Sequence, residues 1–503
     1  MEKAKSKTGL TGIAAAIVCA CLALTLTACS ASSSASSAAD TSGSSASSVA
    51  SAPSSSSESS NELPNPTAGD APEKSDITVN ETIANSVDGE HAIEVSGSTD
   101  SYANIAVQKT GDSNSGDEAD FYGDNATIFA TDGATLDLSQ IVLESDGTHA
   151  NGVFSYGEGT TVNISDSVIE TTGNCSGGLM TTGGGTMNAK NLRILTSGNS
   201  SAAIRSDRGG GTVNVDGGVY ATSGKGSPVI YSTADITVSN ATMESTASQG
   251  VVVEGKNSVT LNDVALKADN NTKNSDKSSF YQAVMIYQSM SGDAANGEAA
   301  FTMNGGSFEN ANGDVFFVNN TVATISLKGA NIVNNGDGVF LRAAAAGWGN
   351  EGSNGGQVTL NAASQAIDGD MVVDDVSNLN LYLTDSSTFN GAINADGAAG
   401  DVYVELSGGS KWVLTSDSYI TSLTCDADSI DLNGHTLYVD GQAYEAGTAS
   451  TGTAIEHVVT SSGSHGGTPP SGGAPSSGGA PSSGGTPPDK PSGSSSSSSK
   501  SAS

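Results

Sequence analysis

The stretch GATLDLSQIVLES at residues 133–145 is followed by GTTVNISDSVIET at 159–171 and GGTMNAKNLRILT at 184–196. Five more rows of the same pattern begin at residues 210, 233, 256, 298 and 322. Successive rows start 26, 25, 26, 23, 23, 42 and 24 residues apart. A repeat of this length is typical of proteins that stack one structural unit on the next, so the repeat decides the fold.

Two apolar columns frame one polar column in these rows. The fourth and sixth positions are apolar, and the fifth is a small polar residue in every row. This alternation predicts a strand with two side chains pointing inward and one pointing outward. The fourth positions are Leu136, Val162, Met187, Val213, Ile236, Val259, Phe301 and Ile325. The fifth positions are Asp137, Asn163, Asn188, Asn214, Thr237, Thr260, Thr302 and Ser326.

Two further strands complete each repeat. Polar residues and glycines at the seventh and eighth positions suit a turn, and an apolar eleventh position belongs to a second strand. A third apolar run precedes each row, as at residues 152–156 and 314–317. Three short strands per coil predict an all-β fold, a right-handed parallel β-helix with coils about 4.8 Å apart. A β-propeller would need about 40–45 residues per blade, which these steps do not match.

The N-terminus carries the signals of an exported protein. Lys3, Lys5 and Lys7 precede an apolar run over residues 10–26, which is typical of a signal peptide. The run ends in Leu-Thr-Ala-Cys29, which resembles the lipobox of bacterial lipoproteins. The resemblance implies cleavage before Cys29, lipid on its sulfur, and a location on the cell membrane facing outside the cytoplasm. The alternatives are an ordinary secretory cleavage nearby and an uncleaved anchor.

Composition divides the chain into four parts. Residues 1–28 are the predicted signal peptide, and residues 29–73 form a Ser/Ala-rich linker. That linker has too little apolar surface to offset its ordering entropy, so we expect it to be disordered. Residues 74–450 are the predicted β-helix, with weaker capping rows at both ends. Residues 451–503 form a Gly/Pro/Ser-rich tail, also expected to be disordered.

The repeat region is similar to a known group of proteins. Residues 75–445 resemble the pectate-lyase-like β-helix group, and the closing segment at residues 411–439 resembles adhesin-like surface proteins. The resemblance implies the fold and leaves the activity open, because lyases, binding modules and adhesins share it.

The chain is strongly acidic. Its formal net charge is −35, and it contains only four arginines. Nucleic acid is excluded as a partner, because its phosphates require clustered cations. An acidic surface could attract Ca²⁺. We predict no cofactor other than this cation, and no metal ligands can be named.

No catalytic constellation is found, so no catalytic residues are predicted. Asp374 and Asp375 are adjacent, and neighbours on a strand point to opposite faces, so they cannot act as an acid and base pair. We interpret them as two solvated aspartates of a turn. We interpret Arg205, Asp207 and Arg208 as a surface salt-bridging cluster rather than as the basic group of a lyase. The five histidines have no metal-ligand spacing and are interpreted as solvated or turn residues.

Two insertions depart from the regular coil. The 42-residue step predicts an extra loop around residues 270–280, and a second loop covers residues 343–356. The second loop contains Trp348, whose ring is our candidate for stacking on a sugar, since exposed loop aromatics serve that purpose. The alternative is that Trp348 folds back and covers apolar residues of the coil.

Three functions are consistent with these features. The first is a non-enzymatic, adhesin-like or structural surface lipoprotein that presents a binding face. The second is Ca²⁺-assisted binding of an acidic polysaccharide. The third is a polysaccharide lyase or hydrolase. The expected partners are the membrane, through Cys29, and a host or cell-wall glycan or a surface protein.

The repeat also makes a prediction about cysteines. Cys175 and Cys425 lie at least eight coils apart, or roughly 35–40 Å at the coil spacing. A disulfide needs Cα atoms within about 7 Å, so we expect both thiols to be unpaired.

Overall fold

The computed structural model describes residues 63–64, 71–273, 275, 277, 280–397 and 400–458. The predicted signal peptide, the lipid-attachment residue Cys29 and nearly all of the linker lie outside the described residues, as does the tail from residue 459 onward. Within the described part, strands run from Glu81 to Ala443, within the bounds predicted for the β-helix. The expected all-β fold class is confirmed.

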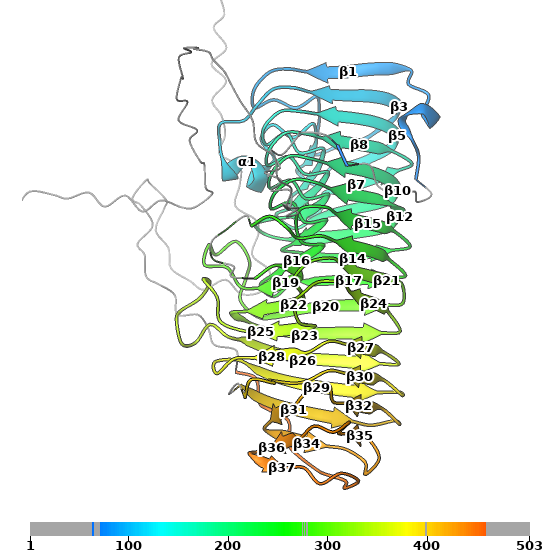
Figure 1. Ribbon diagram of the computed structural model, residues 1–503. Coiled ribbons are helices and arrows are strands. Elements are labelled where there is room, and N and C mark those ends of the chain that lie inside the picture. Colours follow the sequence, from blue (N-terminus) through cyan, green and yellow to red (C-terminus); the bar gives the residue numbers. More distant parts are fainter. Residues whose placement is uncertain are drawn as a thin grey trace, which may run out of the picture. The chain divides into compact units, whose positions relative to one another are not determined.

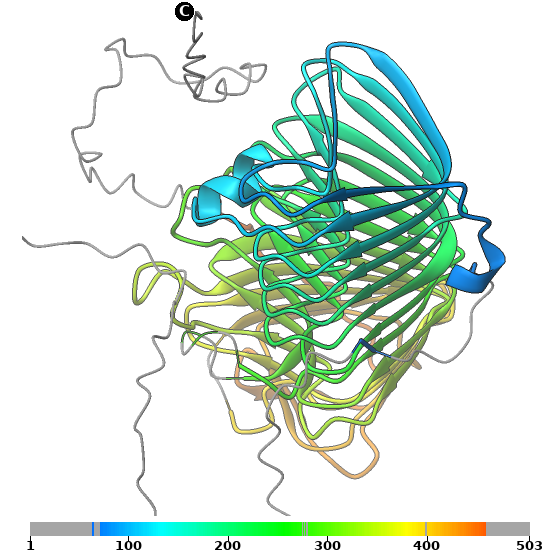
Figure 2. The same cartoon turned by 90° about the horizontal axis from the view of Figure 1, so that it is seen from above.

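The strands wind into a right-handed parallel β-helix whose coils follow one another along a common axis (Figures 1 and 2). Each coil has a first, a second and a third strand in the predicted order. The first and second strands together form a 19-stranded sheet, and the third strands form an 11-stranded sheet. A four-stranded and a three-stranded sheet complete the C-terminal coils.

One long strand supplies both the first and the second strand in four coils, whereas other coils use two strands. The long strands are β3 (Thr99–Lys109), β5 (Thr135–Ser145), β10 (Gly185–Thr196) and β12 (Gly211–Thr222). The separate first strands are β7 (Thr161–Ser165), β14 (Asp235–Ser239), β17 (Ser258–Asn262), β20 (Glu298–Asn304), β23 (Thr321–Lys328), β26 (Gly356–Ala363), β29 (Asn378–Thr384), β31 (Asp401–Leu406) and β34 (Ser422–Thr424).

The separate second strands occupy one further side of the coil. They are β1 (Glu81–Asn85), β8 (Val168–Thr171), β15 (Thr242–Ser245), β18 (Ala265–Ala268), β21 (Ser307–Asn310) and β24 (Asn331–Asn334). The four-stranded sheet then contains β27 (Ala366–Asp368), β30 (Thr388–Asn390), β32 (Lys411–Val413) and β35 (Ile430–Asp431).

The third strands occupy the remaining side. They are β2 (Ile93–Ser96), β4 (Ile128–Thr131), β6 (Val153–Tyr156), β9 (Leu179–Thr182), β11 (Ile204–Ser206), β13 (Ile230–Ser232), β16 (Val251–Glu254), β19 (Gln282–Tyr287), β22 (Asp314–Asn319), β25 (Leu341–Ala343) and β28 (Met371–Val373). The closing three-stranded sheet contains β33 (Ser418–Ile420), β36 (Leu437–Val439) and β37 (Gln442–Ala443).

The corner between first and second strands is sharper than a conventional turn. In β5 and β10 a single residue, Gln140 or Asn191, takes a left-handed conformation with φ of 51° or 52°. Asn, Asp and Gly tolerate this conformation better than other residues do. Because only one residue turns the corner, parallel pairing continues directly on both sides of it.

The strand register equals the alignment of the rows. Fourth-position residues pair in consecutive coils, as Val213 does with Ile236 and Ile236 with Val259. The five residues expected to stack as one buried column are all at most 1% exposed, which confirms the prediction. These residues are Val162, Val213, Ile236, Val259 and Ile325. The core is therefore a set of apolar columns parallel to the axis.

The excursions from the regular coil gather on one side. The 42-residue step contains the predicted loop between β18 and β19 and also a second loop between β19 and β20, which the sequence analysis missed. These loops, the one before β26 and the helix α1 (Asp117–Tyr122) project from the same side of the β-helix (Figure 1).

The only other helical segment described is η1 (Lys74–Asp76). Neither helix in the described part of the chain is long and apolar enough to cross a membrane.

Both cysteines of the described β-helix are free, as the linear stack requires. Cys175 follows β8 and is partly exposed, whereas Cys425 follows β34 and is buried. The expectation that they do not pair is confirmed.

We predict that Val238→Asp unfolds the β-helix, because the new carboxylate would lie at a fully buried position between Val215 and Leu261. An unpaired charge there costs several kcal/mol at least. The matched control is Thr237→Asp, since Thr237 is the adjacent, outward-facing residue of the same strand. In denaturant titrations the control should lose less than about 1 kcal/mol. Equal losses for the two variants would contradict the inward and outward assignment.

Candidate functional site

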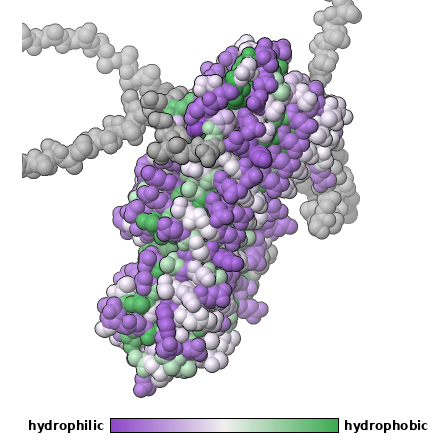
Figure 3. Space-filling view, turned by 90° about the vertical axis from the view of Figure 1, so that its right-hand side faces the viewer, coloured by the Kyte–Doolittle hydropathy of each residue, from purple (hydrophilic) through white to green (hydrophobic). Residues whose placement is uncertain are grey.

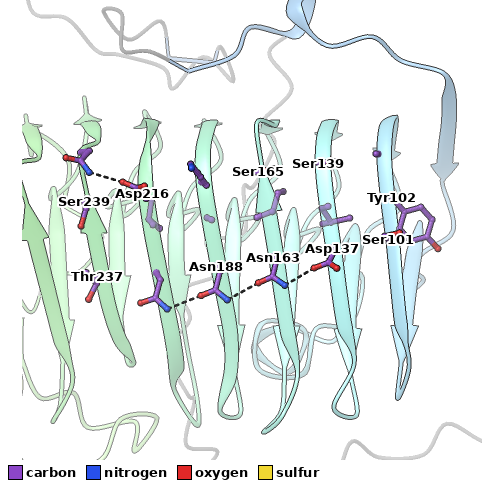
Figure 4. Close-up of a pocket in the computed structure, with 18 residues that line it drawn as sticks. Ser101, Tyr102, Asp137, Ser139, Asn163, Ser165, Asn188, Asp216, Thr237 and Ser239 are labelled. Atoms are coloured by element: carbon purple, nitrogen blue, oxygen red, sulfur yellow. Dashed lines mark hydrogen bonds between the residues drawn. The ribbon is translucent and has the colours of Figure 1, made fainter.

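An open groove follows the outer surface of the first strands near the N-terminal end of the β-helix (Figure 4). Its volume is about 920 Å³, and it crosses the coils of β3, β5, β7, β10, β12 and β14. Outward-facing residues of the fifth and seventh row positions line it, so it runs across successive coils rather than along one strand. We call this feature the ladder groove.

A ladder of side-chain hydrogen bonds forms the floor of the groove. The Asn163 amide donates to Asp137 over 2.8 Å, that of Asn188 to Asn163 over 2.9 Å, and that of Asn214 to Asn188 over 3.0 Å. A side-chain amide has two N–H donors and an acceptor oxygen with two lone pairs. Each amide in the middle of the ladder therefore keeps one donor and one lone pair, repeated at the coil spacing of about 4.8 Å.

Few charges lie in the ladder groove. Asp137 and Asp216 are both exposed, and they stand on coils separated by two others. At about 4.8 Å per coil their backbones are roughly 14 Å apart, so the two carboxylates cannot share one Ca²⁺ ion. Lys190 adds the one cationic side chain of the lining, and Tyr102 adds a ring at one end. Burial, together with nearby Asp100, raises the pKa of Tyr102 above its ordinary value, so the phenol stays neutral.

The same outer face holds an extended segment of the chain itself at the C-terminal coils. The Asn380 side chain donates to the carbonyl of Ile455 and accepts from its N–H, each over 2.9 Å. Gln357 binds Val458 in the same two-bond manner, over 2.6 Å each. Residue 455 contacts β29 and residue 458 contacts β26, one coil earlier. The segment therefore runs back toward the N-terminal coils. Amides on this face thus hold an extended segment of the same chain across two coils.

One side of the β-helix is seen in the surface view (Figure 3). It is mostly hydrophilic, and its apolar side chains are scattered. This pattern agrees with the polar outward positions of the strands. Large apolar patches, which often mark protein interfaces, are absent from this view.

A second cluster of functional groups lies at α1, the third strands and the turns that precede them, away from the ladder groove. Asp120 of α1 is 2% exposed and forms an ion pair with Arg205, with 3.1 Å between Oδ2 and the guanidinium nitrogen. Arg205 also donates to Asp207 over 2.9 Å. His149 Nδ1 lies 3.2 Å from Asp120 Oδ1, and Cys175 adjoins both side chains. We call these five residues the Asp120 cluster.

The interpretation of Arg205, Asp207 and Arg208 as a surface cluster is wrong in one respect. The Arg205–Asp207 ion pair exists, but Asp207 is buried and Arg205 is largely covered. Two residues of α1 contact this strand surface, since Asp120 pairs with Arg205 and the Phe121 ring lies against Arg208. Arg208 does remain partly exposed, where it binds Asp293 over 2.7 Å and stacks on the Phe121 ring.

Burial changes the acidity of the Asp120 cluster. Burial raises the pKa of Asp207 to about 7, although the neighbouring Arg205 guanidinium opposes the change. Asp120 is buried as well, but the charge of Arg205 brings its pKa below the ordinary value. Burial and the nearby Asp120 carboxylate raise the pKa of the Cys175 thiol to about 11. The cluster therefore holds Asp120 as a carboxylate and Cys175 as a neutral thiol at pH 7.

A regular backbone position brings His149 and Cys175 together. Both have φ of 55°, and each N–H donates to the carbonyl of the equivalent turn one coil later. Ser200 occupies the same position in the following coil, with φ of 56°. His149 and Cys175 are 26 residues apart, which is one coil, so the repeat period could have revealed this pair. The sequence predicts solvated or turn histidines; His149 lies in a turn, but it is buried rather than solvated.

Trp348 takes the folded-back position that we considered as the alternative to sugar stacking. Its ring packs edge-on against Tyr287 with centroids 5.1 Å apart and covers the apolar cluster that includes Phe317. Asn354 donates to the Trp348 carbonyl over 2.8 Å and fixes the loop. The ring is still partly exposed, so its role in ligand binding stays a prediction.

Of the adjacent aspartates Asp374 and Asp375, the first makes hydrogen bonds that support a loop. Asp374 accepts hydrogen bonds from the Ala345 N–H over 2.7 Å and from the Ser377 hydroxyl over 2.6 Å. It thereby fastens the loop that carries Trp348. Asp375 is exposed. The two therefore belong to a turn, in agreement with the sequence analysis.

Comparisons of the chain with protein-family models, with curated proteins and with solved structures found no match of any kind. The similarity to β-helical surface lipoproteins therefore rests on the lipobox-like sequence that ends in Cys29 and on the repeat of residues 75–445.

We predict that Cys175 of the folded, chelator-treated protein reacts slowly with iodoacetamide. With a pKa of about 11 in place of 9.0, its thiolate fraction at pH 8 is about 100-fold below that of an ordinary thiol. Labelling would be followed by mass spectrometry of peptides, with the unfolded protein as control. Rapid labelling of Cys175 in the folded protein would contradict the environment described.

Proposed function

We propose that this protein is a non-enzymatic, adhesin-like surface lipoprotein that binds an extended polymer lengthwise in the ladder groove. One observation carries the proposal: residues 455–458 already lie across the same face, held by paired amide hydrogen bonds from Asn380 and Gln357. The ladder groove offers amides of the same kind on successive coils.

A polysaccharide is the first candidate for this polymer. Each sugar hydroxyl both donates and accepts hydrogen bonds, which matches the one spare donor and one spare lone pair of Asn163 and Asn188. Tyr102 at the end of the groove adds a ring on which a sugar could stack. Such a site needs no fixed charge, so a neutral glycan suits it. An acidic glycan would need bridging Ca²⁺, because the chain carries a net charge of −35.

An extended polypeptide is the second candidate. The chain's own segment is a polypeptide, and Gln357 binds both the N–H and the carbonyl of one residue in it. A segment of a surface protein on another cell could be held in the same way. This alternative uses the same face and the same amides, so one set of variants tests both.

The membrane anchor completes the proposal. The Leu-Thr-Ala-Cys29 sequence supports lipid attachment, and the 29–73 linker would hold the β-helix away from the membrane. Exposure outside the cytoplasm then brings the ladder groove to host or cell-wall polymers.

We predict that Asn163→Ala combined with Asn188→Ala weakens binding about 10-fold or more, because two ladder amides and their hydrogen bonds are lost. Glycan and peptide arrays, run with Ca²⁺ and then with chelator, would identify the ligand, and its affinity would be compared between variants. Asn331→Ala is the matched control, since Asn331 is an exposed asparagine on a second strand.

Three outcomes would contradict the proposal. If the folded protein binds no polymer on either array, the proposed binding function is contradicted. Equal affinity of the double variant and the control would show that the polymer binds outside the ladder groove. Release of shortened products from a bound polysaccharide would show a lyase or hydrolase instead of a non-enzymatic protein.

A further inference from the structure

The Asp120 cluster has a chemistry that polymer binding does not use. It combines a carboxylate, an imidazole and a thiol, and it lies at α1 and the turns that precede the third strands rather than in the ladder groove. We propose that Asp120, His149 and Cys175 bind one Zn²⁺ ion, or a transition-metal ion of similar preference.

The three side chains converge on a volume the size of one ion. One ligand atom from each of Asp120, His149 and Cys175 lies within 4.8 Å of the other two. Tetrahedral bonds of about 2.0–2.3 Å from zinc to its ligands place neighbouring ligand atoms roughly 3.3–3.8 Å apart, so the ligand atoms that lie furthest apart must approach by about 1–1.5 Å when the ion binds. Among the residues that the structure describes, this is the one group of three such side chains with that spacing.

An unpartnered buried atom points to the same conclusion. The His149 side chain is nine-tenths buried, and its Nδ1 has no hydrogen-bond partner among the described residues. Its contact with Asp120 Oδ1, over 3.2 Å, is an ion-pair contact and does not satisfy Nδ1 as a hydrogen bond. Buried polar atoms are normally paired, because leaving one unpaired costs about 1–3 kcal/mol. A metal ion between Nδ1 and the carboxylate would supply the missing partner.

The type of ligand selects the ion. One sulfur, one nitrogen and one oxygen are typical of zinc, whereas Ca²⁺ and Mg²⁺ bind through oxygen. Three protein ligands leave the fourth tetrahedral position open, as in zinc sites that bind water or substrate. Cys175 is the one partly exposed member of the three, so the open position would face the less covered side.

Arg205 is compatible with a cation in this site. It is paired with Asp207 at 2.9 Å and with Asp120 at 3.1 Å, so two carboxyl groups face its charge. The Asp120 carboxylate and a Cys175 thiolate provide two negative charges for a divalent ion. Arg205 binds Asp120 Oδ2, while the Asn151 amide donates to Oδ1 over 3.0 Å. Outer contacts of this kind orient a ligating carboxylate.

The fold holds two of the ligands in place without the metal. His149 and Cys175 occupy one left-handed backbone position in successive coils, fixed by hydrogen bonds to the next turn. The shared backbone conformation gives the Cα–Cβ bonds of His149 and Cys175 equivalent directions in successive coils. Ser200 shows that a serine is accepted at this position, with φ of 56°, so Cys175→Ser should fold.

Co²⁺ is the probe for the test, because a cobalt–thiolate bond gives an intense near-ultraviolet absorption. The full chain with Cys19, Cys21 and Cys29 changed to serine, which is the background for every variant, should bind one equivalent of Co²⁺ with this absorption, and so should its Cys425→Ser variant; Zn²⁺ should displace the Co²⁺. Cys175→Ser should lose the absorption. His149→Asn, which keeps a residue suited to positive φ, should bind at least 10-fold more weakly. Circular dichroism and thermal unfolding confirm that each variant is folded.

Folded protein that gives no stoichiometric thiolate absorption with Co²⁺ would overturn the proposal. So would an unchanged absorption in Cys175→Ser, or equal affinity in His149→Asn. Should His149→Asn fail to fold, Asp120→Asn serves in its place, and it too should bind at least 10-fold more weakly. None of these outcomes depends on the ladder groove, whose polymer binding should be the same in all the variants.

Discussion

Every feature of this β-helix depends on in-register parallel pairing between one coil and the next. A residue and its equivalent one row later pair directly, as Val213 pairs with Ile236. Adjacent strands lie about 4.8 Å apart, so each row position becomes a column along the axis. The properties of a column therefore follow from one kind of residue repeated in sequence. A change at one position affects mainly the equivalent residues of the preceding and the following coil.

Inward and outward columns contribute differently to stability. Full burial of a Val, Leu or Ile side chain contributes about 1.5–3 kcal/mol, and the fourth-position column alone has one such residue in nearly every coil. A neutral hydrogen bond contributes only about 0.5–1.5 kcal/mol, and less where water competes with it. The asparagine ladder on the outside is thus a minor element of stability. Its amides are available for binding, as those of Asn380 and Gln357 are for the chain's own segment.

Most of the fold could be predicted from the sequence, and much of the candidate site could not. The columns, the three strands per coil and the unpaired cysteines follow from row spacing, since the period fixes the register. The ladder asparagines were visible as fifth-position residues, but the groove above them depends on how neighbouring side chains fill space. The burial of Arg205 and Asp207 depends on α1, a six-residue helix whose packing on the third strands no repeat records. His149 and Cys175 could have been paired by their 26-residue spacing, whereas Asp120 could not.

The most direct measurement tests the register that underlies the columns, the ladder and the paired turn positions. In a chain whose five native cysteines are all changed to serine, Asn163→Cys combined with Asn188→Cys places two cysteines on paired positions. Their Cα atoms should lie about 5 Å apart, so mild oxidation should form a disulfide nearly completely. Asn163→Cys with Lys190→Cys places them on the order of 8 Å apart, beyond disulfide reach, and should stay reduced. Cross-linking of the second pair in preference to the first would contradict the register and the account built on it.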